Sequence, residues 1–287
     1  MEPGLLALVV ITFVAAFVNG ALGYGFSSIT VPVGLLFFSN RVLNPALVLI
    51  EVFINLYVLF INRASIPAVW KRVLPILIGL APGVALGSYV LASIHPGWLK
   101  FVTYALLLPL LLVQAGGLRY PIKAEKLVGV PFGAGLGFLY SVTTISGPPL
   151  ALLFNNQGYV KRDFRAGLAV IRVAESTLTA IVYYHLGMFT VQALGLVETI
   201  LLGVLVGIPL GAFAIRKLDP ETFRRICMSF DVWIVGFGLS KVLIDLKLAQ
   251  GAGAYSAMLA AVLIDAWLLY AFFSKNVSLR RNRPAAG

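Results

Sequence analysis

Charged residues are scarce in this chain of 287 residues: they make up 11% of it, whereas hydrophobic residues make up 60%. A soluble globular domain carries roughly 25% charged residues, so this chain could not cover its own surface with polar groups. Its mean hydropathy is +0.96. The shortage of charge excludes an ordinary soluble domain and predicts a protein whose surface faces lipid.

Cysteine is nearly absent, and so are the motifs of common enzymes. Cys227 is the single cysteine, which excludes an internal disulfide and argues against a cysteine-based metal site. The sequence has no Walker loop, no H-E-x-x-H pair and no Ser/His/Asp spacing. We therefore expect no cofactor, no metal ion and no enzymatic activity, and the lack of a nucleotide motif argues against a primary pump.

The net charge of +11 comes from basic residues that cluster in short loops between apolar runs. In a membrane protein this pattern marks cytoplasmic loops, so we interpret it as orientation and expect no nucleic-acid partner. The basic clusters lie near 63–72, 119–126, 161–165, 216–225 and in the tail after 274. The resulting prediction is a multi-pass protein of the inner (plasma) membrane, with the N-terminus outside and the C-terminus cytoplasmic.

Apolar segments recur along the whole chain and predict an all-α polytopic membrane helix bundle. They run at about 4–38, 43–62, 73–93, 98–116, 127–156, 166–186, 193–215, 225–244 and 254–273. Most fit one tilted crossing. Segments 4–38 and 127–156 are too long for one simple span. Segment 127–156 also lies between two basic loops, so it must enter and leave on the same side.

The two halves of the sequence resemble each other. The stretch GVALGSYVLASIHP, which begins at Gly83, matches GIPLGAFAIRKLDP, 124 positions later. Upstream the offset is 121, which pairs Glu51 with Arg172. Opposite charge character in corresponding loops predicts inverted repeats. We therefore divide the chain into a first repeat (1–120), an inverted second repeat (121–250), and an extra transmembrane helix with a basic tail (251–287).

Both long segments are interrupted by small and polar residues, so each repeat is expected to open with a broken or re-entrant helix. Glycine permits such a break, and the N–H groups of the following half-helix can bind an anion. An alternative is that these residues only allow tight packing. The candidate substrate-binding residues in these two segments are Asn19, Gly23, Gly25, Ser27, Ser28, Thr143, Thr144, Ser146 and Gly147.

The stretches G20-ALGYGFSSITVP-32 and G133-AGLGFLYSVTTISGPP-149 carry a family resemblance. Together with the segment spacing and the internal repeat, they resemble the TauE/SafE sulfite exporter family over nearly the whole chain. The resemblance implies transport of sulfite, sulfonates or related organosulfur anions, usually outward.

Charged residues inside apolar segments are costly and usually face a cavity or each other. Arg172 offers a planar fork suited to a sulfonate or another oxyanion, which makes it a further substrate-binding candidate. Alternatively it forms a structural ion pair with Glu175 or with Glu51, which also has Asn55 one turn further on. Either carboxylate could instead carry a coupling proton.

These observations favour a secondary transporter that moves a small sulfur oxyanion or organosulfur anion, of sulfite, sulfonate or sulfoacetate type, by alternating access. The alternatives are an anion channel, a transporter of another small anion such as a carboxylate, an intramembrane enzyme using Glu51 or Glu175, and a non-transporting subunit. The expected partners are the anionic substrate, the lipid bilayer and a coupling proton, with a homodimer as one arrangement.

Overall fold

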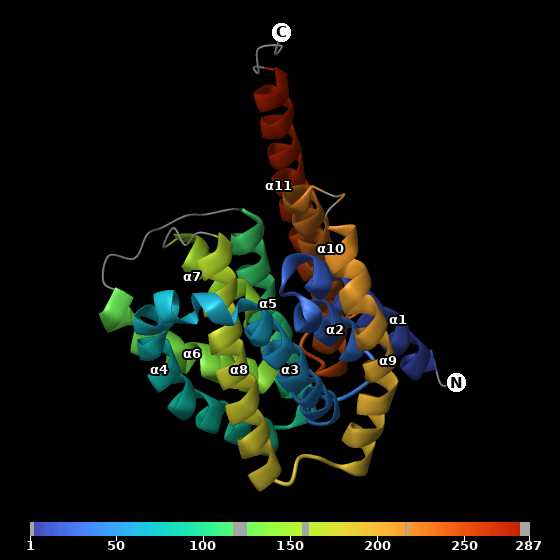
Figure 1. The fold of residues 1–287 in the computed structure, drawn as a ribbon. Helices are drawn as coiled ribbons and strands as arrows, with labels where there is room; N and C mark the ends of the chain where they lie inside the picture. The colour runs from blue at the N-terminus through green and yellow to red at the C-terminus, as the bar shows by residue number, and fades with distance from the viewer. Residues whose placement is uncertain (1–2, 117–124, 157–160, 216, 218, 282–287) are drawn as a thin grey trace.

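The computed structural model describes residues 3–116, 125–156, 161–215, 217 and 219–281. These residues form eleven α-helices and two short 3-10 helices, η1 (Arg63–Ser65) and η2 (Gly251–Tyr255), and no strand (Figure 1). The all-α prediction is confirmed. The α-helices are α1 (Pro3–Leu22), α2 (Phe26–Gly34), α3 (Asn40–Asn62), α4 (Ile66–Ser93), α5 (Pro96–Ala115), α6 (Glu125–Thr143), α7 (Gly147–Asn156), α8 (Lys161–His185), α9 (Val191–Ala214), α10 (Pro220–Asp245) and α11 (Ser256–Arg281).

Seven helical stretches of the described chain are long and apolar enough to cross a membrane. The longest, Asn40–Ser93, runs through α3, η1 and α4. The chain is therefore a multi-pass membrane protein. Its orientation in the membrane stays a prediction. The structure does not describe the side chains of several basic residues from which that orientation is predicted: Arg119, Lys123, Arg216, Arg280, Arg281 and Arg283.

Both long segments contain the predicted break. Helix α1 ends at Leu22, and Gly23 and Gly25 take positive φ angles before α2 begins. Helix α6 ends at Thr143, and Thr144 takes a positive φ angle before α7 begins at Gly147. The two breaks fall at the same place in the predicted repeat, because α1 and α6 end 121 positions apart, as Leu22 and Thr143 show.

The chain turns back at each break. In the first segment, a Cβ on Gly4 at the start of α1 would lie 3.2 Å from the Cβ of Phe37, which follows α2. In the second segment, Phe154 near the end of α7 belongs to the same core cluster as Val73, in the first half of α4. Helix α6 runs alongside α4 from that same level, where Gly129 faces Pro75. Each pair of helices therefore begins and ends near the same side of the bundle.

Glycine stripes on α4 and α9 let two neighbouring helices come into backbone contact, as expected for small residues four apart. A Cβ on Gly79 or Gly83 would clash with the backbone of α6 at Val130 or Ala134. The stripe Gly203, Gly207 and Gly211 of α9 meets the backbone of α1 in the same way. The first helix of each predicted half is thus packed on the fourth helix of the other half.

The centre of the bundle is formed by α3 and α8, which lie side by side in Figure 1. Helix α11 packs on α10 and extends beyond the bundle at its C-terminal end. A buried ion pair joins these two helices, with Arg225 Nη2 2.8 Å from Asp265 Oδ1. The arrangement brings the two breaks and the charged residues of α3 and α8 into one buried region.

Candidate functional site

The two breaks meet inside the bundle. A Cβ on Gly147, the first residue of α7, would lie 3.6 Å from the ring of Tyr24, which sits between the two glycines of the first break. The half-helices α2 and α7 therefore start from neighbouring points. Because a helix N-terminus carries a partial positive charge and free N–H groups, the two starts together favour negative charge in this region.

Glu51 of α3 is the centre of the site and is fully buried. Its Oε1 accepts hydrogen bonds from Ser27 Oγ at 2.7 Å and from Arg172 Nη2 at 3.0 Å. Its Oε2 accepts one from the Tyr140 hydroxyl at 2.6 Å. Three elements, α2, α6 and α8, therefore supply the carboxylate of α3 with its partners. Of the two ion pairs that the sequence left open, the structure forms the one between Arg172 and Glu51.

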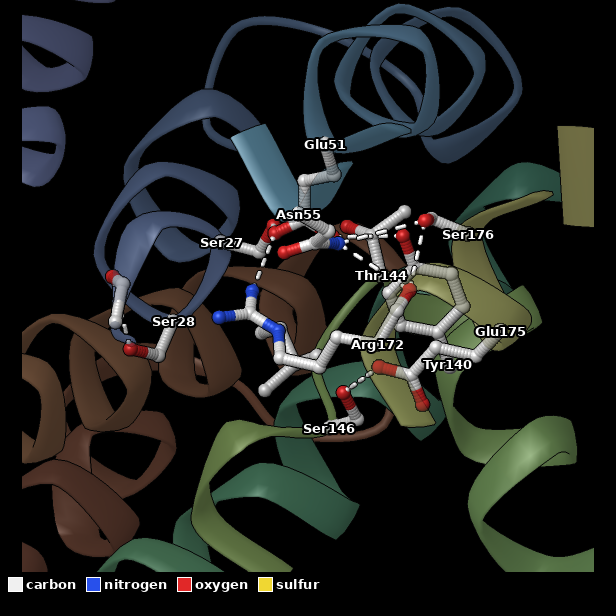
Figure 2. A network of polar contacts seen from close by, with 12 residues as sticks. Ser27, Ser28, Glu51, Asn55, Tyr140, Thr144, Ser146, Arg172, Glu175 and Ser176 are labelled. Carbon is white, nitrogen blue, oxygen red and sulfur yellow. Dashed lines mark hydrogen bonds and ion pairs between the residues drawn. The ribbon is translucent and has the colours of Figure 1, made fainter. Parts of the chain in front are cut away.

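Glu175 of α8 is the second carboxylate, and the Ser146 hydroxyl donates a hydrogen bond to it. Ser146 directly precedes α7, just as Ser27 belongs to the first turn of α2. Each half-helix thus presents a serine to a carboxylate at its positive end. Figure 2 shows the Arg172 side chain between the Ser27–Glu51 pair and the Ser146–Glu175 pair.

Asn55 joins α3 to the backbone of α8. Its amide nitrogen lies 3.3 Å from the Arg172 carbonyl oxygen and 3.4 Å from Ser176 Oγ, and Ser176 in turn donates to the same carbonyl. Glu51 and Asn55 are one turn apart, so they share a face of α3. That face fixes the position of the Arg172 backbone and, through Glu51, the position of its guanidinium.

The cluster holds two carboxylates and one guanidinium, and it retains unused hydrogen-bonding capacity. Arg172 is 5% exposed, yet its Nε has no hydrogen-bond partner, and Glu175 Oε2 lacks one as well. Buried polar atoms without partners are uncommon and call for an explanation. A site that exchanges its internal partners for a ligand would leave such atoms.

Four of the predicted residues shape the breaks: two glycines through their backbone angles, and two threonines through hydrogen bonds within their own turn. Gly23 and Gly25 supply the positive φ angles of 83° and 107°. The Thr143 hydroxyl donates to the Leu139 carbonyl and accepts from the Ile145 N–H. The Thr144 hydroxyl donates to the carbonyl of the preceding residue. These groups build the turn that places Ser146.

Two predicted residues lie apart from the Arg172 cluster. Ser28 points away from it in Figure 2, and its hydroxyl donates to the Gly25 carbonyl. Asn19, in the last turn of α1, is buried with its amide oxygen unpaired, and no described contact joins it to Glu51 or Arg172.

Tyr140 is the site residue that the sequence interpretation missed. It lies on α6, one helical turn before the break at Thr144, and its hydroxyl is the partner of Glu51 Oε2. A polar aromatic residue one turn before a break is a weak signal, since tyrosine also occurs widely in packed cores.

Seven candidate spans around two converging half-helices fit a membrane transporter, since a broken helix inside a bilayer is tolerated only where protein buries it or where it lines an aqueous cavity. The chain belongs to the sulfite exporter TauE/SafE family, whose sequence model matches residues 8–238. The match covers both breaks and the Arg172 cluster and ends within α10. No curated protein and no solved structure matches the chain significantly. Membership of a transporter family agrees with the expectation that the chain is not an enzyme.

Proposed function

We propose that this protein is a secondary transporter that exports a small sulfur oxyanion or organosulfur anion, of sulfite, sulfonate or sulfoacetate type, across the inner membrane by alternating access. Family membership supports an anion of this class. The observation that carries the proposal is the set of donors around Glu51: a guanidinium, a serine hydroxyl and a tyrosine hydroxyl, next to two helix N-termini.

Glu51 occupies the place that a substrate anion would take. A sulfonate or sulfite needs several hydrogen-bond donors and a positive charge, and this donor set supplies both. In the structure the carboxylate of Glu51 satisfies the donors itself. Substrate binding then requires that Glu51 moves away or is neutralised.

Charge in the cluster supports a proton as the coupling ion. With both Glu51 and Glu175 ionised, the two carboxylates outweigh the single Arg172 guanidinium, so the cluster is negative and repels an anion. One proton on either carboxylate makes the cluster neutral, and a negative substrate can then enter at a lower electrostatic cost. Protonation of the cluster therefore favours binding of the anion.

The test is a thermal-shift screen of the purified protein against sulfite, sulfate, thiosulfate, taurine, sulfoacetate and simple carboxylates. A ligand that binds the folded state raises the melting temperature by mass action. Arg172→Lys keeps the charge but loses the fork, so we expect affinity for the best ligand to fall by at least about tenfold. The matched control is Arg225→Lys, which alters a second buried arginine ion pair outside the site. Unchanged affinity in a folded Arg172→Lys protein would refute the binding role.

A small carboxylate is the second candidate substrate, because the group that fills the donor set in the structure is itself a carboxylate. Stabilisation by acetate-like ligands and by none of the sulfur anions in the same screen would favour it. Channel activity is separated by transport assays: a carrier shows saturable counterflow, whereas a channel gives single-channel currents.

We also propose that the halves 1–120 and 121–250 are inverted repeats, with the N-terminus outside and the C-terminus cytoplasmic. The reciprocal packing of α1 on α9 and of α6 on α4 supports this arrangement. Cysteine-accessibility labelling tests it: residues placed in 119–126 and 161–165 should both react from the cytoplasm, and reaction from opposite sides would refute the topology. A homodimer stays a prediction that a measured mass in detergent can check.

A further inference from the structure

A second polar region lies on the other side of the first break. Asp231 of α10 is 4% exposed, and its Oδ1 has no hydrogen-bond partner. It lines a cavity of about 20 Å³, which is large enough for one water molecule or one ion of similar size. Tyr24, Gly25 and Ser28 of the first break line the same cavity. The Arg172 cluster makes no described contact with Asp231.

The cavity offers Asp231 polar neighbours but no paired cation. The Ser28 hydroxyl lies beside the carboxylate. Gln114 of α5 is buried, its Nε2 is unpaired, and rotation of its terminal amide can turn either nitrogen or oxygen toward the cavity. Arg224 and Cys227 also line the cavity, yet no described ion pair reaches Asp231. The remaining lining is mostly apolar. A buried carboxyl group in such surroundings is neutralised either by its own proton or by a bound cation.

The end of α1 adds to the negative character of this cavity, because Val18 and Leu22 of its last turns are among the lining residues. The last carbonyl groups of a helix lack intrahelical partners and carry the negative end of its dipole. At the end of α6, side chains satisfy two such carbonyls: Tyr183 donates to Ser141 and Asn44 to Val142. No described side chain donates to the carbonyls at the corresponding positions of α1, Gly20 and Ala21.

We propose that this cavity binds a monovalent cation of the size of sodium, with Asp231 as its charged ligand and Ser28 and Gln114 as further ligands. The lining offers a single carboxylate, which neutralises one positive charge, whereas a calcium ion carries two charges and takes six to eight oxygen ligands. The inference goes beyond the proposed function, since cation binding here requires no anionic substrate. Ser27 faces the anion site and Ser28 the cation site, so the two sites share one half-helix.

The test is the melting temperature of the purified protein without substrate, as sodium chloride replaces choline chloride at constant ionic strength. We expect a saturable rise with sodium that follows mass action. Asp231→Asn should weaken the apparent affinity for sodium by at least about tenfold, because the charged ligand is lost. The control Asp245→Asn lies on the same helix at an exposed position and should keep the full response.

Absence of a sodium-dependent rise in the unmodified protein, or an undiminished rise in Asp231→Asn, would overturn the proposal. If Asp231→Asn does not fold, Ser28→Ala and Gln114→Leu decide: a weaker sodium response in either supports the site, and an unchanged response in both refutes it. Arg172→Lys should retain the sodium response. The two proposals therefore fail separately: the anion proposal through the anion affinity of Arg172→Lys, and the cation proposal through the sodium response of Asp231→Asn.

Discussion

At the first break Gly23 and Gly25 take φ angles of 83° and 107°, whereas at the second break Thr144 takes one of 57°. Glycine adopts this left-handed backbone conformation without steric cost, but a threonine there costs about 1–2 kcal/mol of folding free energy. The Thr144 hydroxyl donates a hydrogen bond to the Thr143 carbonyl within the same turn, which offsets part of that cost. The first break therefore uses glycine, whereas the second uses a strained threonine whose hydroxyl helps to hold the turn.

The breaks also differ in how their polar groups are satisfied. Side chains of α3 and α8 donate to the carbonyls at the end of α6, while the end of α1 borders a cavity with an unpaired carboxylate. At the half-helix starts, Ser27 meets a carboxylate that is paired with Arg172, and Ser146 meets one that has no described ion pair. Two similar sequence motifs thus provide different electrostatic surroundings.

The largest expected effect separates the two carboxylates. Glu51→Gln leaves Arg172 as a buried charge without its partner, which should destabilise the protein by about 3–5 kcal/mol. Glu175→Gln removes a carboxylate without a described ion pair and should cost about 1 kcal/mol or less. Denaturant unfolding in detergent measures both, with Glu198→Gln as the exposed control. Equal losses would contradict the assignment of Arg172 to Glu51.

The next prediction concerns the carbonyls at the end of α6. Tyr183→Phe removes the donor to the Ser141 carbonyl and leaves that buried group unsatisfied, at a cost of about 1–3 kcal/mol. The neighbouring Tyr184 is 73% exposed, so Tyr184→Phe should leave the stability unchanged. A similar melting temperature for the two variants would show that the second break does not depend on this donor.

Alanine substitutions compare how strongly stability depends on the glycine that precedes α2 and on the glycine that begins α7. Gly25→Ala places a side chain at a φ angle of 107° and puts its Cβ 3.3 Å from Val18, so a loss of about 1–2 kcal/mol is expected. In Gly147→Ala the new Cβ would lie at an ordinary 3.6 Å from Tyr24, and the change should stay within about 0.5 kcal/mol. Melting temperatures of the two variants decide the matter, and a larger loss for Gly147→Ala would reverse the comparison.

The smallest expected effect comes from exchanging the turn residues. Thr144→Gly relieves the positive φ angle but loses a local hydrogen bond, so the net gain should be at most about 1 kcal/mol. Gly23→Thr creates the same strain at a position where the new Cβ would have no neighbour within 4 Å to stabilise it, and should cost about 1–2 kcal/mol. Opposite signs for the two variants, measured by denaturant unfolding, are the expected outcome. A loss in both would mean that Thr144 is favoured for its hydroxyl.

Much of the fold could be predicted because it depends on local composition. Scarcity of charge and long apolar runs indicate membrane helices, since no other environment suits such a surface. Glycine-rich stretches near Gly25 and Gly147 indicate the breaks, because these residues weaken a helix wherever they occur. The 121-residue offset of the repeat also lies in the sequence, and it pairs Glu51 with Arg172 before any coordinates are considered.

The partners of the polar side chains were decided by the tertiary structure. Arg172 could pair with Glu175 one turn away or with Glu51 in another helix, and packing of α3 against α8 selects Glu51. Tyr140 joins the site because α6 ends beside α3, and Ser28 leaves it because consecutive helical residues point about 100° apart. A sequence pattern fixes which face of its own helix a residue occupies. Which other helix meets that face depends on contacts between residues far apart in the chain.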